Sequence, residues 1–256
     1  MLPLHAEELL DVWERGAGRS ALDRSLVLLS AASPEIDPAG RAALTVGERD
    51  AALLGLREAT FGPRAEAVAP CPDCGALVEF EFAVDELHSG GAAGSLVRED
   101  GELRVAADGF EVRVRLPTVA DVSALSAGRP AAGSVRAELL RRCVIEVRRG
   151  GVDVDTEELS PGAEEAIEAA MASADPDADI SFALTCAECG RVWSAPFDVS
   201  AFVWAEIEAR ARRLLAEVDA LASAYGWSEG EIVALSPRRR QAYLELSSVA
   251  GEAEPP

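Results

Sequence analysis

Four of the five cysteines occur as two pairs with the same spacing, Cys71 with Cys74 and Cys186 with Cys189. In each pair two residues separate the thiols, a spacing typical of zinc ligands and of redox dithiols. The fifth, Cys143, lies on the apolar face of a predicted helix. We therefore expect Cys143 to be a small buried hydrophobic residue and not a nucleophile.

The segments around the two pairs repeat each other. A shift of 115 residues superposes Cys71 on Cys186, Gly75 on Gly190 and Phe82 on Phe197. Each copy alternates polar and apolar residues around Cys-x-x-Cys-Gly, which predicts a strand, a tight turn that favours glycine, and a second strand. This is the form of a zinc knuckle, which supplies two thiolates. Because tetrahedral zinc takes four ligands, Cys71, Cys74, Cys186 and Cys189 are predicted to form one closed structural site for Zn²⁺.

Two alternatives to a shared zinc site remain open at this point. The pairs could be separate redox dithiols, although thioredoxin-type pairs begin a helix and both pairs here are followed by predicted strands. They could also be oxidised or free of metal. The two histidines, His5 and His88, form no His-Glu-x-x-His helix, so a hydrolytic metal centre is not expected.

Helices and strands alternate in blocks along the chain, which predicts an α+β fold. We expect a helical N-terminal segment (1–64), a middle segment of β-hairpins and helices flanked by the knuckles (65–199), a helical C-terminal segment (200–250) and a flexible tail (251–256), all within one integrated domain. The middle segment is predicted to contain a hairpin around Asp108 and Gly109, a helix over 134–147 and then a surface loop. A long helix over 201–225 and two short helices are predicted to follow.

The C-terminal segment holds the candidate partner-binding residues. Arg238, Arg239 and Arg240 form the one basic run, at a predicted helix start where cations are unfavourable, so they are a candidate contact for an acidic partner. Tyr225, Trp227 and Tyr243 are candidates for the same surface. The simpler interpretations are a solvated helix start and aromatic side chains packed in the core.

Charge excludes several classes of partner. The 256 residues include 45 acidic and 24 basic ones, for a net charge of −21, and every basic residue is arginine. Such a chain is repelled by nucleic acid and by anionic bilayers. Its apolar runs are shorter than the ~20 residues of a membrane span, and Glu7 and Glu8 are unlike a signal peptide, so we expect a cytoplasmic protein. The glycine-rich stretch 89–95 lacks the residues of a phosphate loop, and no motif indicates an enzyme or a small-molecule substrate.

Short motifs spread from Leu9 to Leu246 resemble one known family. They include the segments 9–15, 46–50, 61–63 and 115–118, the two cysteine motifs, and the segment 225–229 with Arg239, Arg240 and Tyr243. The chain is similar to T4-like baseplate hub assembly proteins, also described as hub assembly chaperones, of contractile phages and phage-tail-like contractile injection systems. The resemblance implies a non-enzymatic component or transient chaperone, whose partners are other baseplate, hub or tail proteins and which can enter the particle.

Two other functions are kept as alternatives to the resemblance. One is a zinc-ribbon regulatory module that binds nucleic acid or a polymerase, which the cysteine pairs alone suggest and the net charge opposes. The other is a dithiol oxidoreductase, which requires cysteines that cycle and bind no metal.

Overall fold

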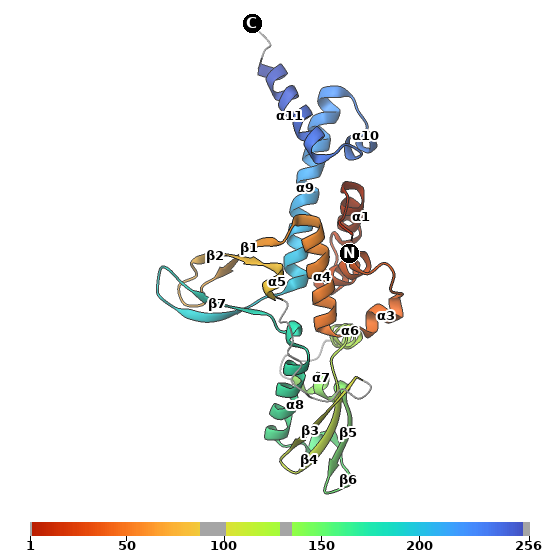
Figure 1. Ribbon diagram of the computed structural model, residues 1–256, viewed down its shortest axis with the longest axis vertical. Helices are drawn as coiled ribbons and strands as arrows, with labels where there is room; N and C mark the ends of the chain where they lie inside the picture. The colour runs from red at the N-terminus through yellow and green to blue at the C-terminus, as the bar shows by residue number, and fades with distance from the viewer. Residues whose placement is uncertain (1, 88–100, 129–134, 253–256) are drawn as a thin grey trace.

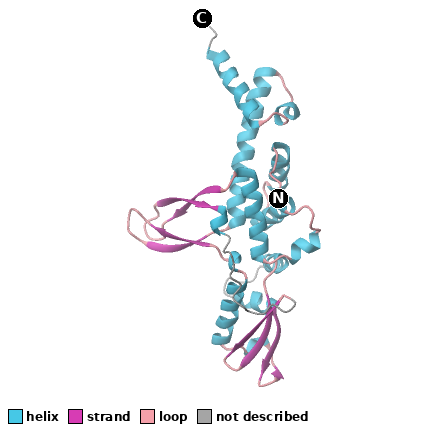
Figure 2. Ribbon diagram, in the orientation of Figure 1, coloured by secondary structure: helices cyan, strands magenta, loops and turns pink. Residues whose placement is uncertain are grey.

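The long helix α9 (Val199–Tyr225) runs through the middle of an elongated molecule, with the other elements arranged around and beyond it (Figure 1). The computed structural model describes residues 2–87, 101–128 and 135–252. Helices predominate, and the strands form small antiparallel sheets (Figure 2). This arrangement confirms the predicted α+β class. None of the described helices has both the length and the apolar character needed to cross a membrane.

The helical body consists of N-terminal helices packed beside α9. These helices are α1 (Ala6–Gly16), α2 (Ala21–Ala32), α3 (Pro38–Ala43) and α4 (Val46–Phe61). Thr45 and Glu48 form a capping box at the start of α4. Apolar faces of α1, α2, α4 and α9 share one core, in which Leu28, Leu53 and Ile207 are at most 1% exposed. Full burial of each such side chain contributes about 1.5–3 kcal/mol.

Two β-hairpins project from one side of α9 and are called the hairpin arm here (Figure 1). The first pairs β1 (Arg64–Pro70) with β2 (Leu77–Ala83), and the second pairs β7 (Ser181–Thr185) with β8 (Val192–Pro196). A single helical turn, α5 (Val84–Leu87), follows β2. Both hairpins lie where the alternating pattern predicts strands, and each carries one Cys-x-x-Cys motif in its turn.

A four-stranded antiparallel sheet, called the distal sheet here, lies at the end of the molecule opposite the C-terminus (Figure 1). Its strands, in their order across the sheet, are β3 (Glu102–Ala107), β4 (Phe110–Arg115), β5 (Val144–Arg149) and β6 (Val152–Asp153). Helix α8 (Pro161–Ala174) lies against β3 and β4, and its Ile167 is fully buried with Leu103 and Val114. The hairpin at Asp108 and Gly109 was predicted.

Two expectations for the distal sheet were wrong. The helix expected over 134–147 ends at Cys143, as α7 (Val135–Cys143), and Val144–Arg149 is the strand β5. The loop expected after it begins with a turn at Gly150 and Gly151 and continues into β6. The physical reason is tertiary: residues 144–149 hydrogen-bond to the open edge of β4, an interaction with distant residues that local periodicity does not reveal.

Hydrogen bonds attach the distal sheet to the helical body through its flanking segments. Helix α6 (Val119–Gly128) follows β4. Arg115 of β4 forms a bidentate ion pair with Asp121 in the first turn of α6, with N···O distances of 2.6 and 2.9 Å. Between α8 and the 3₁₀ turn η3 (Pro176–Ala178), the Asp175 carboxylate accepts a 3.1 Å hydrogen bond from the amide of Gly47 in α4. The remaining 3₁₀ turn, η2 (Thr156–Glu158), precedes α8.

The C-terminal end consists of two helices beyond α9. Gly226 ends α9 in the left-handed conformation, and α10 (Glu229–Val233) and α11 (Pro237–Glu252) follow. A capping box of Ser228 and Glu231 starts α10. The glycine-rich stretch 89–95 and residues 253–256 of the expected tail lie outside the described residues, whereas 251 and 252 belong to α11.

Candidate metal centre

The two cysteine turns have the same backbone geometry. In the first, the amide of Gly75 donates to the Cys71 carbonyl at 2.9 Å, and the amide of Cys71 donates to the Ala76 carbonyl at 2.8 Å. In the second, Gly190 and Cys186 make the equivalent bonds at 3.0 and 2.8 Å. Both glycines have positive φ angles, 73° and 74°, which side chains disfavour. The sequence repeat is therefore a structural repeat.

The hairpin arm brings the four repeated cysteines together. Their sulfurs all lie within 4.8 Å of one another, although the two pairs are more than a hundred residues apart in the sequence. Across the hairpins, Sγ of Cys71 lies 3.6 Å from Sγ of Cys189, and Sγ of Cys74 lies 3.6 Å from Sγ of Cys186. A disulfide requires about 2.05 Å. Four thiolates around one zinc ion, at about 2.3 Å from it, are about 3.8 Å apart, so the cluster has the size of a metal site.

The chemistry of the cluster also favours a cation. The backbone amide of Cys74 holds the pKa of Cys71 at about 7, against the effect of desolvation. The backbone amide of Arg191 likewise lowers the pKa of Cys189. Desolvation and the neighbouring thiols outweigh this effect and raise the pKa of Cys189 to about 12. The Cys71 thiol therefore ionises readily. Its negative charge then repels any further thiolate that forms beside it. A bound cation would remove this repulsion.

Aromatic side chains pack the hairpin arm against the helical body. Phe82 of β2 lies at the centre of this phenylalanine cluster, with ring centroids 4.9 Å from Phe182 of β7, 5.3 Å from Phe197 and 5.7 Å from Phe202 of α9. Phe80 extends the cluster along β2, 4.7 Å from Phe182. The hairpins thus meet at the turns through the sulfurs and near their bases through the rings. The repeat alignment paired Phe82 with Phe197, but the contact with α9 has no signal in the sequence.

Cys143 is separate from the metal-site cysteines. It ends α7 and is fully buried in the apolar core of the distal sheet. Burial raises the pKa of the Cys143 thiol to about 11, which keeps it protonated and unreactive at neutral pH. The expectation of a small buried hydrophobic residue is confirmed.

The predicted partner-binding residues lie at the junction of α9, α10 and α11. Tyr225 stacks on Trp227 with ring centroids 4.7 Å apart, and Tyr243 meets Trp227 edge to face at 4.8 Å. Tyr225 is exposed, and the other two rings are half-buried. The three side chains form a compact aromatic group that remains open to solvent on one side.

The basic run divides between the surface and the interior. Arg238 and Arg239 are exposed, but Arg240 is only 1% exposed. Its Nε donates to Glu217 of α9 at 2.9 Å, and its Nη1 donates to the Leu235 carbonyl at 2.6 Å. The sequence gives no sign of this burial, because Glu217 lies 23 residues earlier. Arg240 therefore ties α11 to α9, and its role in partner binding stays a prediction.

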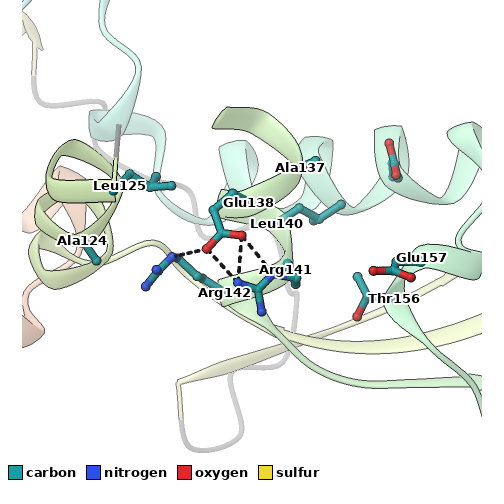
Figure 3. Close-up of a pocket in the computed structure, with 11 residues that line it drawn as sticks. Ala124, Leu125, Ala137, Glu138, Leu140, Arg141, Arg142, Thr156 and Glu157 are labelled. Atoms are coloured by element: carbon teal, nitrogen blue, oxygen red, sulfur yellow. Dashed lines mark hydrogen bonds and ion pairs between the residues drawn. The ribbon is translucent and has the colours of Figure 1, made fainter. Parts of the chain in front are cut away.

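A cavity that the sequence does not indicate lies between α6, α7 and η2 (Figure 3). It has a volume of about 460 Å³. Glu138 projects into it and accepts hydrogen bonds from Arg141 and Arg142 at 2.8–2.9 Å, and these bonds lower the pKa of Glu138. The charged groups on this wall therefore satisfy one another.

The comparison with protein families concerns the stretch that holds the metal centre. A family model described as T4 bacteriophage base plate protein matches residues 28–204. The matched segment runs from α2 into α9 and includes the whole hairpin arm and the distal sheet. Neither the curated proteins nor the solved structures gave a match. Because the matched segment covers more than half of the 256 residues, this chain belongs to the T4 bacteriophage base plate protein family.

Proposed function

We propose that this baseplate-family chain is a non-enzymatic protein of hub assembly in a contractile tail or a phage-tail-like injection system. In this role it contacts other baseplate, hub or tail subunits and catalyses no reaction. The hairpin arm is stabilised by one structural Zn²⁺ that Cys71, Cys74, Cys186 and Cys189 would hold. The family supports the baseplate part of the proposal, and the sulfur cluster supports the zinc part.

The observation that carries the proposal is the convergence of four thiols from two hairpins. A cluster of four sulfurs offers zinc a complete tetrahedron and leaves no position for a water molecule or a substrate. Such a closed site contributes to folding and not to catalysis. A metal at the tips of two hairpins fixes their relative orientation, which suits a protein that presents a rigid surface to other subunits.

The aromatic group of Tyr225, Trp227 and Tyr243, together with Arg238 and Arg239, is the proposed contact surface at the C-terminal end. Tyrosine and tryptophan supply large contact areas at low entropic cost, and arginine is frequent in protein interfaces. These residues lie at the end of α9, away from the distal sheet (Figure 1). A subunit bound there would not cover the metal centre.

Particle composition tests the proposed role. The gene is deleted in its producing strain, and purified wild-type particles are analysed by quantitative mass spectrometry. We expect deletion to abolish particle assembly. A fixed number of copies per particle would identify a permanent component, and absence from particles would identify a transient chaperone. Normal particles from the deletion strain would contradict the proposal.

Metal analysis of the purified protein tests the zinc site. We expect one zinc per chain, and loss of that zinc when Cys74 is replaced by serine. A Cys143→Ser variant is the matched control and should retain the metal. Protein purified under reducing conditions without zinc, with thiols that cycle between oxidised and reduced forms, would support a dithiol oxidoreductase instead.

A further inference from the structure

A groove of about 910 Å³ lies between α1 and the two C-terminal helices, with part of α9 as its floor. It has about twice the volume of the cavity between α6 and α7. Leu10 and Trp13 of α1 line one wall, Val233 and Leu235 line the opposite wall, and Leu215 of α9 lies between them. All five side chains are half-buried. The groove therefore offers apolar side chains, set among polar ones, that no described residue covers.

The rim of this groove is acidic. Glu7 and Glu14 of α1 and Glu229 of α10 line it, are exposed, and form no ion pair with any of the described residues. The two arginines in the walls do not offset them, because Glu217 pairs with Arg210 at 3.2 Å and with Arg240 at 2.9 Å. A segment that enters the groove thus meets apolar side chains flanked by unpaired negative charge.

Two N–H groups of the groove residues lack acceptors. Nε1 of Trp13 and Nη2 of Arg240 are shielded from solvent and have no hydrogen-bond partner within the described part of the chain. Both side chains line the groove. Unpaired donors that water cannot reach destabilise a protein. Because solvent does not reach these two N–H groups, a carbonyl of a segment in the groove does not reach them either, so binding there depends on the apolar side chains and the acidic rim.

From these features we infer that the groove binds a basic, amphipathic segment of a partner protein. Its apolar side chains pack between Leu10 and Val233, and its arginine or lysine side chains pair with Glu7, Glu14 and Glu229. A second copy of this chain is a poor occupant, because its net charge of −21 would repel the acidic rim. The inference rests on the proposed assembly role, in which such partners are tail subunits.

Site-specific photo-crosslinking in the producing cells tests this assignment. Benzoylphenylalanine is placed at Ala234, an exposed groove residue, and in a second variant at Leu10 on the opposite wall. The matched control has it at Val152, which is 65% exposed on the distal sheet. We expect both groove positions to crosslink to one short, net-basic segment of another tail or baseplate protein, and the control position not to crosslink to it.

Charge reversal provides the second readout. Replacing Glu7, Glu14 and Glu229 together by arginine should lower the crosslinking yield from Ala234 about tenfold. The same change of charge at Glu66, Glu79 and Glu157, which are exposed elsewhere, should leave that yield unchanged. Crosslinks to a second copy of this chain, to an acidic segment, or to no protein would overturn the inference.

These outcomes test the groove assignment independently of the proposed assembly function. If the chain is needed for assembly but its groove forms no crosslink, only the groove assignment is wrong. If the chain is not needed for assembly, the proposed function is wrong. In that case, crosslinks to a basic segment of some other protein would still support the inferred binding preference of the groove.

Discussion

The hairpin arm and the distal sheet are both small β units, yet they are stabilised in different ways. The distal sheet has four strands, and α8 covers one of its faces over a core that includes Leu103, Val114 and Ile167. The hairpin arm has two separate pairs of strands, which meet in a phenylalanine cluster and in the group of four sulfurs. Isolated two-stranded hairpins are at best marginally stable in water. We therefore expect the arm to depend on a metal cross-link at the sulfurs, where the sheet depends on apolar packing.

This difference shows how one chain can carry a β unit without a core of its own. A metal held by the four cysteines would fix the two hairpins at their tips, at a point where apolar residues would be exposed to water. The phenylalanine cluster fixes their bases against α9. Four perturbations should show that the two regions are stabilised differently. They change the metal, the rings, a buried charge and a turn, and the expected loss of stability decreases in that order.

Metal removal should have the largest effect, and it should be confined to the hairpin arm. Chelation, or Cys74→Ser, should destabilise the arm by more than about 5 kcal/mol, because the binding energy of a structural zinc is part of the folding energy. Hydrogen exchange should show lost protection in β1, β2, β7 and β8 and retained protection in β3, β4 and β5. Cys143→Ser should retain the metal and cost about 1–3 kcal/mol through a buried hydroxyl. Equal, negligible effects at all five cysteines would rule out a shared site.

Removing a central ring should give the next largest effect. Phe82→Ala should lower the free energy of unfolding by about 3–5 kcal/mol, and Leu103→Ala in the distal sheet should lower it by about 2–5 kcal/mol. Chelation distinguishes the two, because residues that stabilise the same unit are energetically coupled. In denaturant titrations, the effect of Phe82→Ala should change when zinc is removed, and that of Leu103→Ala should not. Identical behaviour of the two variants would contradict the comparison.

Acid should weaken the attachment of the distal sheet through Asp121. Hydrogen bonds from Arg115 hold the pKa of Asp121 at about 2, below its ordinary value of 3.8. Because the folded state has the lower pKa, the stabilisation of about 2 kcal/mol is fully present above about pH 4 and is lost as the pH falls towards 2. Unfolding of metal-free protein, measured from pH 5 to 2, should show this loss, and Asp121→Asn should remove it. An unchanged pH profile in the variant would exclude Asp121 as the source.

A turn glycine should give the smallest effect. Gly75→Ala introduces a side chain at φ 73°, where no atom lies close enough to clash, so the cost is the backbone strain of about 1–2 kcal/mol. Gly190→Ala should cost the same, because the two turns are equivalent. Gly230→Ala in α10 is the matched control: it also meets no neighbour but has no positive φ, and it should not destabilise the protein. Thermal unfolding of the three variants measures the difference.

The sequence predicted those parts of the molecule whose determinants are local or repeated. The Cys-x-x-Cys-Gly repeat revealed both turns, and the alternating residues after each revealed the strands. The strand β5 was missed because Leu139, Leu140, Cys143 and Val144 continue a helical stripe across the boundary. Only pairing with β4 decides that the chain becomes extended at Val144.

Features built from several helices could not be predicted in this way. The groove combines residues of α1, α9, α10 and α11, and its acidic rim comes from segments more than two hundred residues apart. The burial of Arg240 depends on Glu217, which lies on a different helix. Local patterns identify each helix but not which faces remain uncovered when the helices pack.

The position of the four cysteines along the chain has a mechanical consequence. With a metal joining the sulfurs, tension applied to the two ends of the chain would pass from Cys71 through the metal to Cys189 and bypass the 118-residue span between them, which contains the distal sheet. Pulling single molecules should therefore release roughly 390–420 Å of chain only after the metal site ruptures, and chelated protein should release it at lower force. A contracting tail could strain this protein without unfolding its distal sheet.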